Sequence, residues 1–425
     1  MHLARWSIAQ TKNRETKAEG IGWELFLNYR LARDKYQPDY FLYENNKSMS
    51  PAIREQITAE LGVEPVLINS ALVSAQNRQR LYWAGKRNPD GTYRRVDVEQ
   101  PVDRGILLRD ILESGVCWKE KGYALLSTTG GTTADDMVSR HQRNGVAEPV
   151  VIKPLTEREM DYMVGSHGKY SDRWTYLQKP VEMDKALCIT ANVHRGVPYN
   201  ICEEPVRIGT LENDAKNPAH DSQQYRVYSP EAKSVTLCGN GGGLGAKTGL
   251  YAVPVIQDGK GQCVIKAAGG NEITVYEVRG GFITIKGKTY PIKLADGFYI
   301  IRKLTVTECK RLQTVPDTYA FPVSDTQAYK MLGNGWTVDV IAHIMSHFEG
   351  MTAEPVEVLS MYDGMSCGHI ALDKLGATIT TYYATEIDKY AIQTTQHNYP
   401  DTIQLGDAFQ VRDLDWQLPQ KEENL

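Results

Sequence analysis

The sequence predicts a two-domain α/β protein: a larger domain with a doubly wound sheet and a second domain formed by a mostly β insert. A strand, a glycine turn and a helix follow one another at residues 356–376. Two apolar runs behind this unit each end in acidic residues, as strands of such a sheet do at a ligand-binding edge. A glycine-rich stretch with short alternating patterns fills the middle of the chain. A length of 425 residues is sufficient for two domains.

The glycine turn at 361–368 has the composition of a cofactor-binding loop. Glycines let the backbone approach a ligand because no Cβ stands in the way, and the helix that follows offers free N–H groups and the positive end of its dipole. The residues of this turn that we expect to contact a cofactor are Tyr362, Asp363, Gly364, Ser366, Cys367 and Gly368.

Acidic residues end the next two apolar runs. Glu386, followed by Ile387, comes about 20 residues after Gly364, the spacing at which a carboxylate meets ribose hydroxyls. Asp407 ends the third run. Because Asp363 would repel a pyrophosphate, S-adenosylmethionine, with its cationic sulfonium, fits better than a dinucleotide. The alternative is a doubly wound domain with ordinary turns.

Polar residues near the N-terminus have the character of a catalytic group. The run at 38–43 reads as a strand that ends at Glu44, and a carboxylate at a strand end suits acid–base chemistry. Alternation places Arg78, Arg80 and Tyr82 on one side of an extended segment, where two arginines suit an anion or a carbonyl-rich base. The alternatives are a solvated loop carboxylate and a basic surface strand.

Together these segments resemble the DNA cytosine-5 methyltransferase family, in its phage or restriction–modification type. The blocks that carry the resemblance are 362–368, Glu386, Gly406-Asp407, Glu44-Asn45-Asn46, Gln76 with Arg78 and Arg80, Arg311-Leu312-Gln313 with Pro316-Asp317, and Gly333-Asn334. Each block alone is a weak signal, and their consistent cyclic order makes the resemblance specific. A capping box at Thr305 and Glu308 predicts a helix that carries the Arg311 block.

The resemblance implies methyl transfer from S-adenosylmethionine to C5 of a cytosine flipped out of double-stranded DNA. In this reading Glu44 donates a proton to N3 of the base, and Arg80 holds O2 with support from Arg78. Asn334 and Trp336 of the Gly333-Asn334 block would add cofactor contacts to those of the glycine turn.

The blocks occur in a rotated order. In the family the cofactor blocks come first, whereas here the Gly333-Asn334 helix leads directly into the cofactor strand at residue 356, which predicts a circular permutant. Between the third cofactor block and the segment that resembles residues 6–10, the family has a strand and a Pro-Cys dipeptide. Its thiolate adds to C6 of the base. The sequence has 7 cysteines, and none follows a proline.

Three explanations of the absent Pro-Cys remain open: a split enzyme whose second chain supplies the strand and the thiol, a truncated reading frame, and a degenerate homologue that binds DNA without methylating it. The retained Glu44, Arg78 and Arg80 favour the first two. A methyltransferase for RNA or small molecules is a more distant alternative, because the large insert and the paired arginines suit DNA.

The resemblance also sets the expected domains and cellular context. We expect residues 1–85 and 302–425 to form the catalytic domain and 86–301 to form the target-recognition domain. The net charge of -4 means that DNA binding must use a local basic cleft. The sequence shows no signal peptide, apolar run of membrane length or paired cysteine spacing typical of a zinc site. We therefore expect a reducing cytoplasm, in a bacterium or a phage-infected cell.

Overall fold

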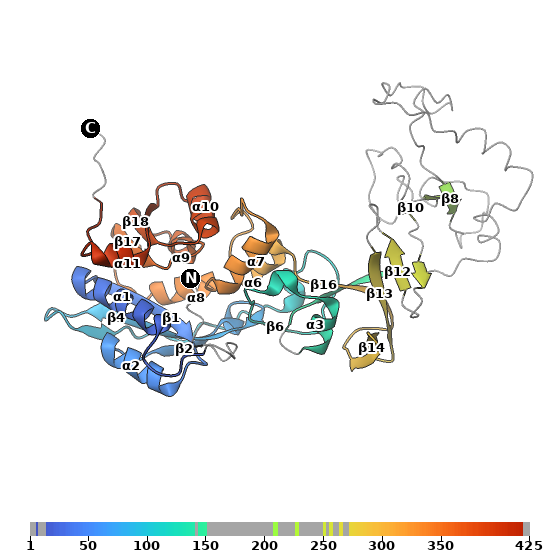
Figure 1. Cartoon of the computed structure of the whole chain (residues 1–425), viewed down its shortest axis with the longest axis horizontal. Helices are drawn as coiled ribbons and strands as arrows, with labels where there is room; N and C mark the ends of the chain where they lie inside the picture. Colours follow the sequence, from blue (N-terminus) through green and yellow to red (C-terminus); the bar gives the residue numbers. More distant parts are fainter. Residues whose placement is uncertain are drawn as a thin grey trace, which may run out of the picture. The chain divides into compact units, whose positions relative to one another are not determined.

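The computed structural model describes residues 6, 14–140, 143–150, 207–210, 226–228, 250–251, 255–257, 263–266 and 272–419 (Figure 1). The chain divides into two compact units. The larger contains Met1–Glu148, Ile285–Leu294 and Ile301–Leu425, and the smaller contains Pro149–Thr284 and Ala295–Ile300. Residues 86–148 thus pack with the larger unit, whereas the division of function at residue 85 remains a prediction.

Helices and strands alternate along much of the larger unit. Its N-terminal part contains α1 (Ile21–Tyr36), β1 (Tyr40–Asn46), α2 (Pro51–Leu61), β2 (Val66–Asn69), β3 (Gln76–Asn77), β4 (Gln79–Arg87), β5 (Tyr93–Arg95), β6 (Gly122–Tyr123) and α3 (Ala134–Ser139). Its C-terminal part contains α6 (Val306–Leu312), α7 (Asp325–Asn334), α8 (Val338–Met345), β17 (Val356–Met361), α9 (Cys367–Leu375), β18 (Ile379–Thr385), α10 (Lys389–Asn398), β19 (Ile403–Gly406) and α11 (Ala408–Asp413).

The C-terminal part confirms the predicted succession of strand, glycine turn and helix. β17, β18 and β19 form a parallel sheet in that order, with α9 and α10 as the crossovers between consecutive strands. Parallel pairing requires such crossovers and aligns the carboxyl ends of the strands at one edge. The three predicted acidic strand ends, Asp363, Glu386 and Asp407, therefore follow strands of the same sheet.

The N-terminal strands differ from a purely parallel arrangement. β4 lies between β1 and β2 and is antiparallel to both, with Glu44 opposite Tyr82. The connection from β2 to β4 is too short for a crossover helix, so the chain has to reverse direction. In the part of the chain that is described, β1 and β17 belong to different sheets, and each is an edge strand.

The core of the larger unit lies around α8, whose residues Val338, Val340, Ile341 and Ile344 are fully buried. A second, aromatic cluster joins α1 to β1 and β4 through Phe26, Tyr43 and Trp83. Contacts from α1 also reach the C-terminal part of the chain. The Tyr362 hydroxyl donates to the Leu25 carbonyl at 2.9 Å. In this way α1 contacts the glycine turn in the C-terminal part of the chain.

The described residues of the smaller unit lie mainly in β-strands. It contains β8 (Arg207–Thr210), β9 (Arg226–Tyr228), β10 (Leu250–Tyr251), β11 (Val255–Gln257), β12 (Cys263–Lys266) and β13 (Glu272–Arg279), and it includes most of β14 (Phe282–Ile285) and of β16 (Gly297–Arg302). β7 (Val146–Val150) begins in the larger unit, to which β15 (Lys288–Pro291) also belongs. Antiparallel pairing of β13 with β14 and with β16 confirms the predicted meander over 275–301.

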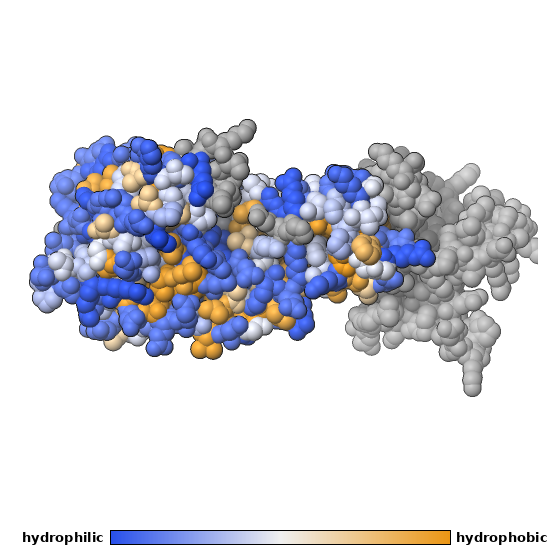
Figure 2. All heavy atoms as spheres, turned by 90° about the horizontal axis from the view of Figure 1, so that it is seen from below, coloured by the Kyte–Doolittle hydropathy of each residue, from blue (hydrophilic) through white to orange (hydrophobic). Residues whose placement is uncertain are grey.

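The surface view in Figure 2 shows mainly hydrophilic side chains with smaller apolar patches between them. Among the described residues, Val102 is an apolar side chain that is largely exposed, and Leu67 on β2 is partly exposed. Across the described ranges, no helix has the length and apolar character needed to cross a membrane.

Candidate functional site

The glycine turn after β17 is held by hydrogen bonds to Asp363. The Ser360 hydroxyl donates to Oδ1 of Asp363 at 2.6 Å, and the Tyr382 hydroxyl donates to the same atom at 2.9 Å. The Ser366 hydroxyl donates to Oδ2. Burial raises the pKa of the Asp363 carboxyl. The structure thus gives Asp363, expected to contact the cofactor, three hydroxyl partners that fix the turn.

The backbone conformation of this turn explains which of its residues need support from their surroundings. Tyr362, Gly364 and Ser366 have φ values of 61°, 62° and 56°, in the left-handed region. Glycine adopts this region without strain, whereas Tyr362 and Ser366 require support from their surroundings. Tyr362 receives it from its hydrogen bond to α1, and Ser366 from Asp363. The turn is therefore fixed before any ligand binds.

Glu386 closes the same turn from the end of β18. Its Oε2 accepts from the Gly364 N–H at 3.0 Å. Its Oε1 accepts from the N–H groups of Ile387 and Asp388, at 2.7 and 2.8 Å. The residue is only 6% exposed. A carboxylate held by three backbone donors has a fixed direction, as recognition of ribose hydroxyls requires.

Four of the predicted cofactor residues line one cleft at the carboxyl edge of the parallel sheet. The residues around this cleft are Tyr362, Thr385, Glu386, Ile387, Gly406, Asp407 and Ala408. Ile387 is 48% exposed and offers an apolar surface beside the Glu386 carboxylate. Asp407 is the N-cap of α11 and accepts from the Phe409 N–H at 3.0 Å. The cleft therefore combines an apolar face with two carboxylates.

The remaining predicted cofactor residues lie around this turn without lining the cleft. Cys367 is buried, and burial raises the pKa of its thiol to about 12. Gly368 packs closely, since an ideal Cβ there would stand 3.1 Å from the Tyr382 hydroxyl. Asn334 is exposed at the end of α7.

Glu44, at the carboxyl end of β1, is bonded through both carboxylate oxygens. Nε of Arg80 lies 3.0 Å from Oε1. The indole N–H of Trp336 donates to Oε2, also at 3.0 Å. The side chains of Arg80 and Glu44 are 18% and 15% exposed, so solvent reaches the pair only partly. The structure thus brings together Glu44 and Arg80 as predicted, and adds Trp336, which the sequence assigned to the cofactor.

Arg78 has a different environment from Arg80. It is 5% exposed and donates to the carbonyls of Gly335 at 2.8 Å, and of Gly333 and Leu125 at 3.4 Å each. Burial, with a smaller effect of the Arg80 charge, lowers the pKa of Arg78 to about 9. The break between β3 and β4 at residue 78 interrupts the alternation on which the sequence prediction depended. Arg78 holds the backbone that precedes Trp336.

A buried group of polar side chains extends this support. Gln313 Nε2 donates to the Leu332 carbonyl at 2.6 Å, while its Oε1 accepts from Gln76 at 2.8 Å and from the Thr337 hydroxyl at 2.9 Å. The Ser70 hydroxyl donates to Thr337 at 2.9 Å. Sequence reasoning found Gln313 as a motif residue but not this scaffolding role. The signal available in the sequence was a glutamine that directly follows the apolar residues of a helix.

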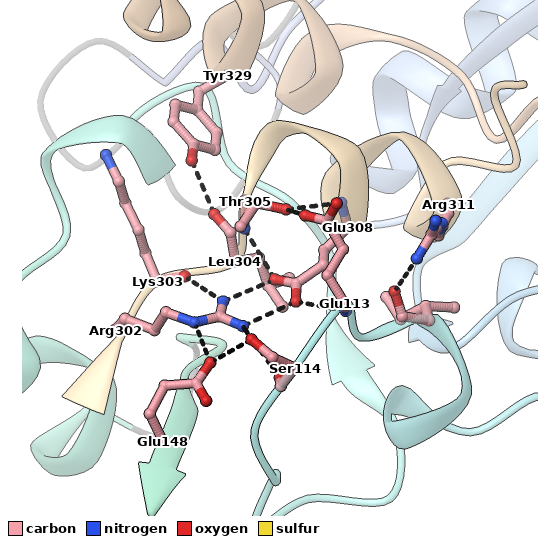
Figure 3. Close-up of polar contacts among 11 residues, drawn as sticks. Glu113, Ser114, Glu148, Arg302, Lys303, Leu304, Thr305, Glu308, Arg311 and Tyr329 are labelled. Atoms are coloured by element: carbon pink, nitrogen blue, oxygen red, sulfur yellow. Dashed lines mark hydrogen bonds and ion pairs between the residues drawn. The ribbon is translucent and has the colours of Figure 1, made fainter. Parts of the chain in front are cut away.

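A second polar cluster, shown in Figure 3, fixes the start of α6. The Arg302 guanidinium donates to both oxygens of Glu308 at 2.9 Å, and its Nε donates to Glu148 at 2.7 Å. The predicted capping box is confirmed, because Thr305 and Glu308 bond each other's backbone N–H. Glu308 is fully buried. The cluster joins the strand that precedes α6 to β7, an assembly that the sequence did not predict.

Three cysteines have described side chains, and none has the character of an activated nucleophile. Cys117 is half-buried, while Cys309 and Cys367 are buried. Burial raises the pKa of each thiol and favours its protonated form. The side chains of Cys188, Cys202, Cys238 and Cys263 lie outside the described part.

The mixed α/β fold, with its glycine turn, acidic strand ends and paired glutamate and arginine, is consistent with an S-adenosylmethionine-dependent methyltransferase. Residues 263–349 match the family model described as C-5 cytosine-specific DNA methylase. This segment includes Gln313, Gly333, Asn334 and Trp336. Members of that family use S-adenosylmethionine as methyl donor.

Curated relatives agree with the family match over short segments. The type II methyltransferase M.HhaI of Haemophilus parahaemolyticus is 34% identical over 84 residues, 19% of this chain and 26% of that protein. M.HpaII of Haemophilus parainfluenzae is 54% identical over 41 residues, 10% of this chain and 12% of that protein. The DNA (cytosine-5)-methyltransferase DRM1A of Oryza sativa subsp. japonica is 29% identical over 96 residues, 23% of this chain and 20% of that protein. These matches support the similarity of this chain to the C-5 cytosine DNA methylase family.

Proposed function

We propose that the protein is a DNA (cytosine-5-)-methyltransferase, which transfers a methyl group from S-adenosylmethionine to C5 of cytosine in double-stranded DNA. The observation that carries this proposal is the pairing of Glu44 with Arg80, at 3.0 Å, in an α/β protein whose C-terminal sheet presents a glycine turn and a carboxylate-lined cleft. The family match supports the same reaction.

The residues around the cleft have side chains that suit the proposed cofactor. Its donor and acceptor set suits an adenosine, because Ile387 offers an apolar surface to the base and Glu386 and Asp407 offer carboxylates to hydroxyl and amino groups. Asp363, which accepts from three hydroxyl groups, keeps the backbone of the turn in place. When bound, S-adenosylmethionine supplies an electrophilic methyl group on a cationic sulfur.

Glu44 and Arg80 are the groups we assign to the base. Cytosine C5 is a poor nucleophile until a thiolate adds to C6, and proton donation to N3 lowers the barrier to that addition. Glu44 would donate this proton, and Arg80 would move from the carboxylate to O2 of a cytosine flipped out of the duplex. Arg78 acts at a distance, by holding the backbone at Gly335.

We assign the thiolate to a Pro-Cys segment supplied by a second chain. Cys117, Cys309 and Cys367 are unsuited to this role because burial keeps their thiols protonated. Within the described residues, β1 and β17 are both edge strands, and the open edge of such a strand can pair with a strand of another chain. The order of the motifs, with α7 and α8 ahead of β17, supports a circularly permuted arrangement.

The remaining assignments follow from the same family. Residues 1–85 and 302–425 would form the catalytic domain, and 86–301 would recognise the target sequence. The protein would act in the cytoplasm of a bacterium or of a phage-infected cell, where methylation protects DNA from restriction. A second candidate is a non-catalytic DNA-binding homologue, which the burial of Cys309 and Cys367 favours.

The decisive experiment measures transfer of labelled methyl from S-adenosylmethionine to mixed-sequence DNA. The chain is assayed alone and together with a Pro-Cys segment from a family member, and the labelled nucleoside is identified. Label at cytosine C5 in the presence of that segment supports the proposal. Binding of cofactor and DNA without transfer in either case would favour the non-catalytic candidate.

A further inference from the structure

Trp336 lies between the two halves of the proposed site. Its indole N–H donates to Oε2 of Glu44 at 3.0 Å. Its ring reaches the start of α9, where an ideal Cβ on Gly368 would stand 3.8 Å from Cζ3 of Trp336. An ideal Cβ on Gly335 would stand 3.1 Å from Sγ of Cys367. The segment 335–336 therefore packs against the cofactor turn and bonds the proposed acid at the same time.

The backbone on both sides of Trp336 is fixed by buried groups. The Gly335 carbonyl accepts from Arg78 at 2.8 Å and from Gln313 at 3.3 Å. Thr337, which is 1% exposed, is bonded to Gln313 through its hydroxyl. A side chain whose neighbours are held in this way has few alternative positions, so the indole donor points at Glu44 before any substrate binds.

The two partners of Glu44 differ in how easily their side chains can move away from its carboxylate. Arg80 has a long side chain. Apart from its contact with Glu44, it donates a hydrogen bond to the carbonyl of the adjacent Gln79 at 2.9 Å. The Arg80 side chain can rotate toward a base, which frees Oε1 of Glu44. Trp336 has less freedom, because its ring lies against α9 and the carbonyl of the preceding Gly335 accepts from Arg78. The carboxylate therefore keeps one fixed bond and exchanges the other.

We propose that Trp336 is the positioning residue that fixes the Glu44 carboxylate and couples it to the cofactor turn. The inference rests on the proposed function and adds to it a role for a residue that was assigned only to the cofactor. Since the same ring contacts α9, the carboxylate and the cofactor turn share one side chain, so a ligand bound at the turn alters the surroundings of the indole.

The test compares two tryptophans whose indoles donate hydrogen bonds of the same length, one to a carboxylate and one to a hydroxyl. Trp336→Phe removes the N–H that Glu44 accepts and keeps an aromatic ring. Trp83→Phe is the matched control, because the Trp83 indole donates to the Thr58 hydroxyl, also at 3.0 Å, within the aromatic cluster of α1 and β4. Loss of a hydrogen bond to a charged group lowers kcat by about 10- to 100-fold at Trp336, with KM for S-adenosylmethionine changed far less. Trp83→Phe leaves kcat within about 2-fold of the wild type. Equal loss of kcat in both variants, or none at Trp336, would overturn the inference.

A second readout does not require methyl transfer and separates this inference from the proposed function. The indole N–H resonances of the ¹⁵N-labelled chain are assigned to Trp336 and Trp83 from their absence in the two Phe variants. Glu44→Gln shifts the Trp336 indole resonance and leaves that of Trp83 in place, and S-adenosylmethionine binding also shifts the Trp336 resonance. If these shifts occur but the wild type combined with the Pro-Cys segment transfers no methyl group, the coupling stands and the proposed reaction fails. A Trp336 resonance that responds to neither change contradicts the coupling.

Discussion

Trp336 and Glu44 are 292 positions apart in the chain, yet the indole of one donates a 3.0 Å hydrogen bond to the carboxylate of the other. The contact joins the turn that follows α7 to the carboxyl end of β1. Glu44 also pairs with Arg80, so both of its oxygens are directed by the fold. This arrangement is the basis of the expectations below.

Replacement of Glu44 tests its role as proton donor. Glu44→Gln keeps the shape of the side chain but removes the acid. We expect methyl transfer to fall by about 100- to 10,000-fold, the contribution typical of general acid–base catalysis. Binding of S-adenosylmethionine, measured by calorimetry, should change little. Glu60→Gln, at an ion pair between α1 and α2, serves as control. Activity unchanged in Glu44→Gln would remove Glu44 from the mechanism.

Arg78 and Arg80 should respond differently to substitution. Arg78→Met removes the Arg78 donor from the Gly333 and Leu125 carbonyls and leaves the Gly335 carbonyl only its longer bond from Gln313, and we expect a loss of about 2–4 kcal/mol in unfolding free energy. Arg80→Met should cost less than about 1 kcal/mol, because the Arg80 pair is partly solvated, and should reduce methyl transfer. Urea unfolding and the transfer assay measure the two effects. Similar stability losses at both positions would contradict the assigned roles.

The cluster around Arg302 should make a large contribution to stability. Glu308 is fully buried, and Arg302→Met would leave its carboxylate without its main partner. We expect a loss of about 3–5 kcal/mol. The exposed pair of Lys286 and Asp135 provides the control, since Lys286→Met should cost less than about 1 kcal/mol. Thermal or urea unfolding measures both, and equal effects would show that burial of Glu308 is unimportant.

Asp363 should give the protein a characteristic pH dependence. Burial, together with the charge of Glu386, raises the pKa of its carboxyl above the ordinary value of 3.8. A carboxyl whose pKa is higher in the folded state than in the unfolded state contributes its full stabilisation at pH values below its unfolded-state pKa. This contribution is lost as pH rises through its folded-state pKa. The stability of the wild type relative to Asp363→Asn should therefore decrease as pH rises above 3.8. Urea unfolding at a series of pH values measures the difference, and an increase with pH would contradict the burial argument.

The sequence predicted the C-terminal sheet well because its signals are local. The strand before Tyr362, the glycine turn and the acidic ends at Glu386 and Asp407 each depend on a few adjacent residues. The same holds for the capping box at Thr305, which forms within one helical turn. Local patterns of this kind predict structure well because the residues that form the contacts are close together in the sequence.

Long-range contacts could not be predicted in the same way. Arg78 appeared to share a face with Arg80, but a break between two strands turns it into the core. The three hydroxyl donors to Asp363 come from Ser360, Ser366 and Tyr382, and the sequence did not predict these contacts. The bond of Trp336 to Glu44 depends on how α7 and β1 pack, which no local pattern records.

Methyl transfer to DNA tests the central claim most directly. The chain, combined with a Pro-Cys segment of the family, is incubated with labelled S-adenosylmethionine and mixed-sequence DNA, and the modified nucleoside is identified. We expect label at C5 of cytosine, lost when Glu44 is replaced by Gln. Label at any other atom, or no label from a complex that binds both cofactor and DNA, would contradict the proposed reaction.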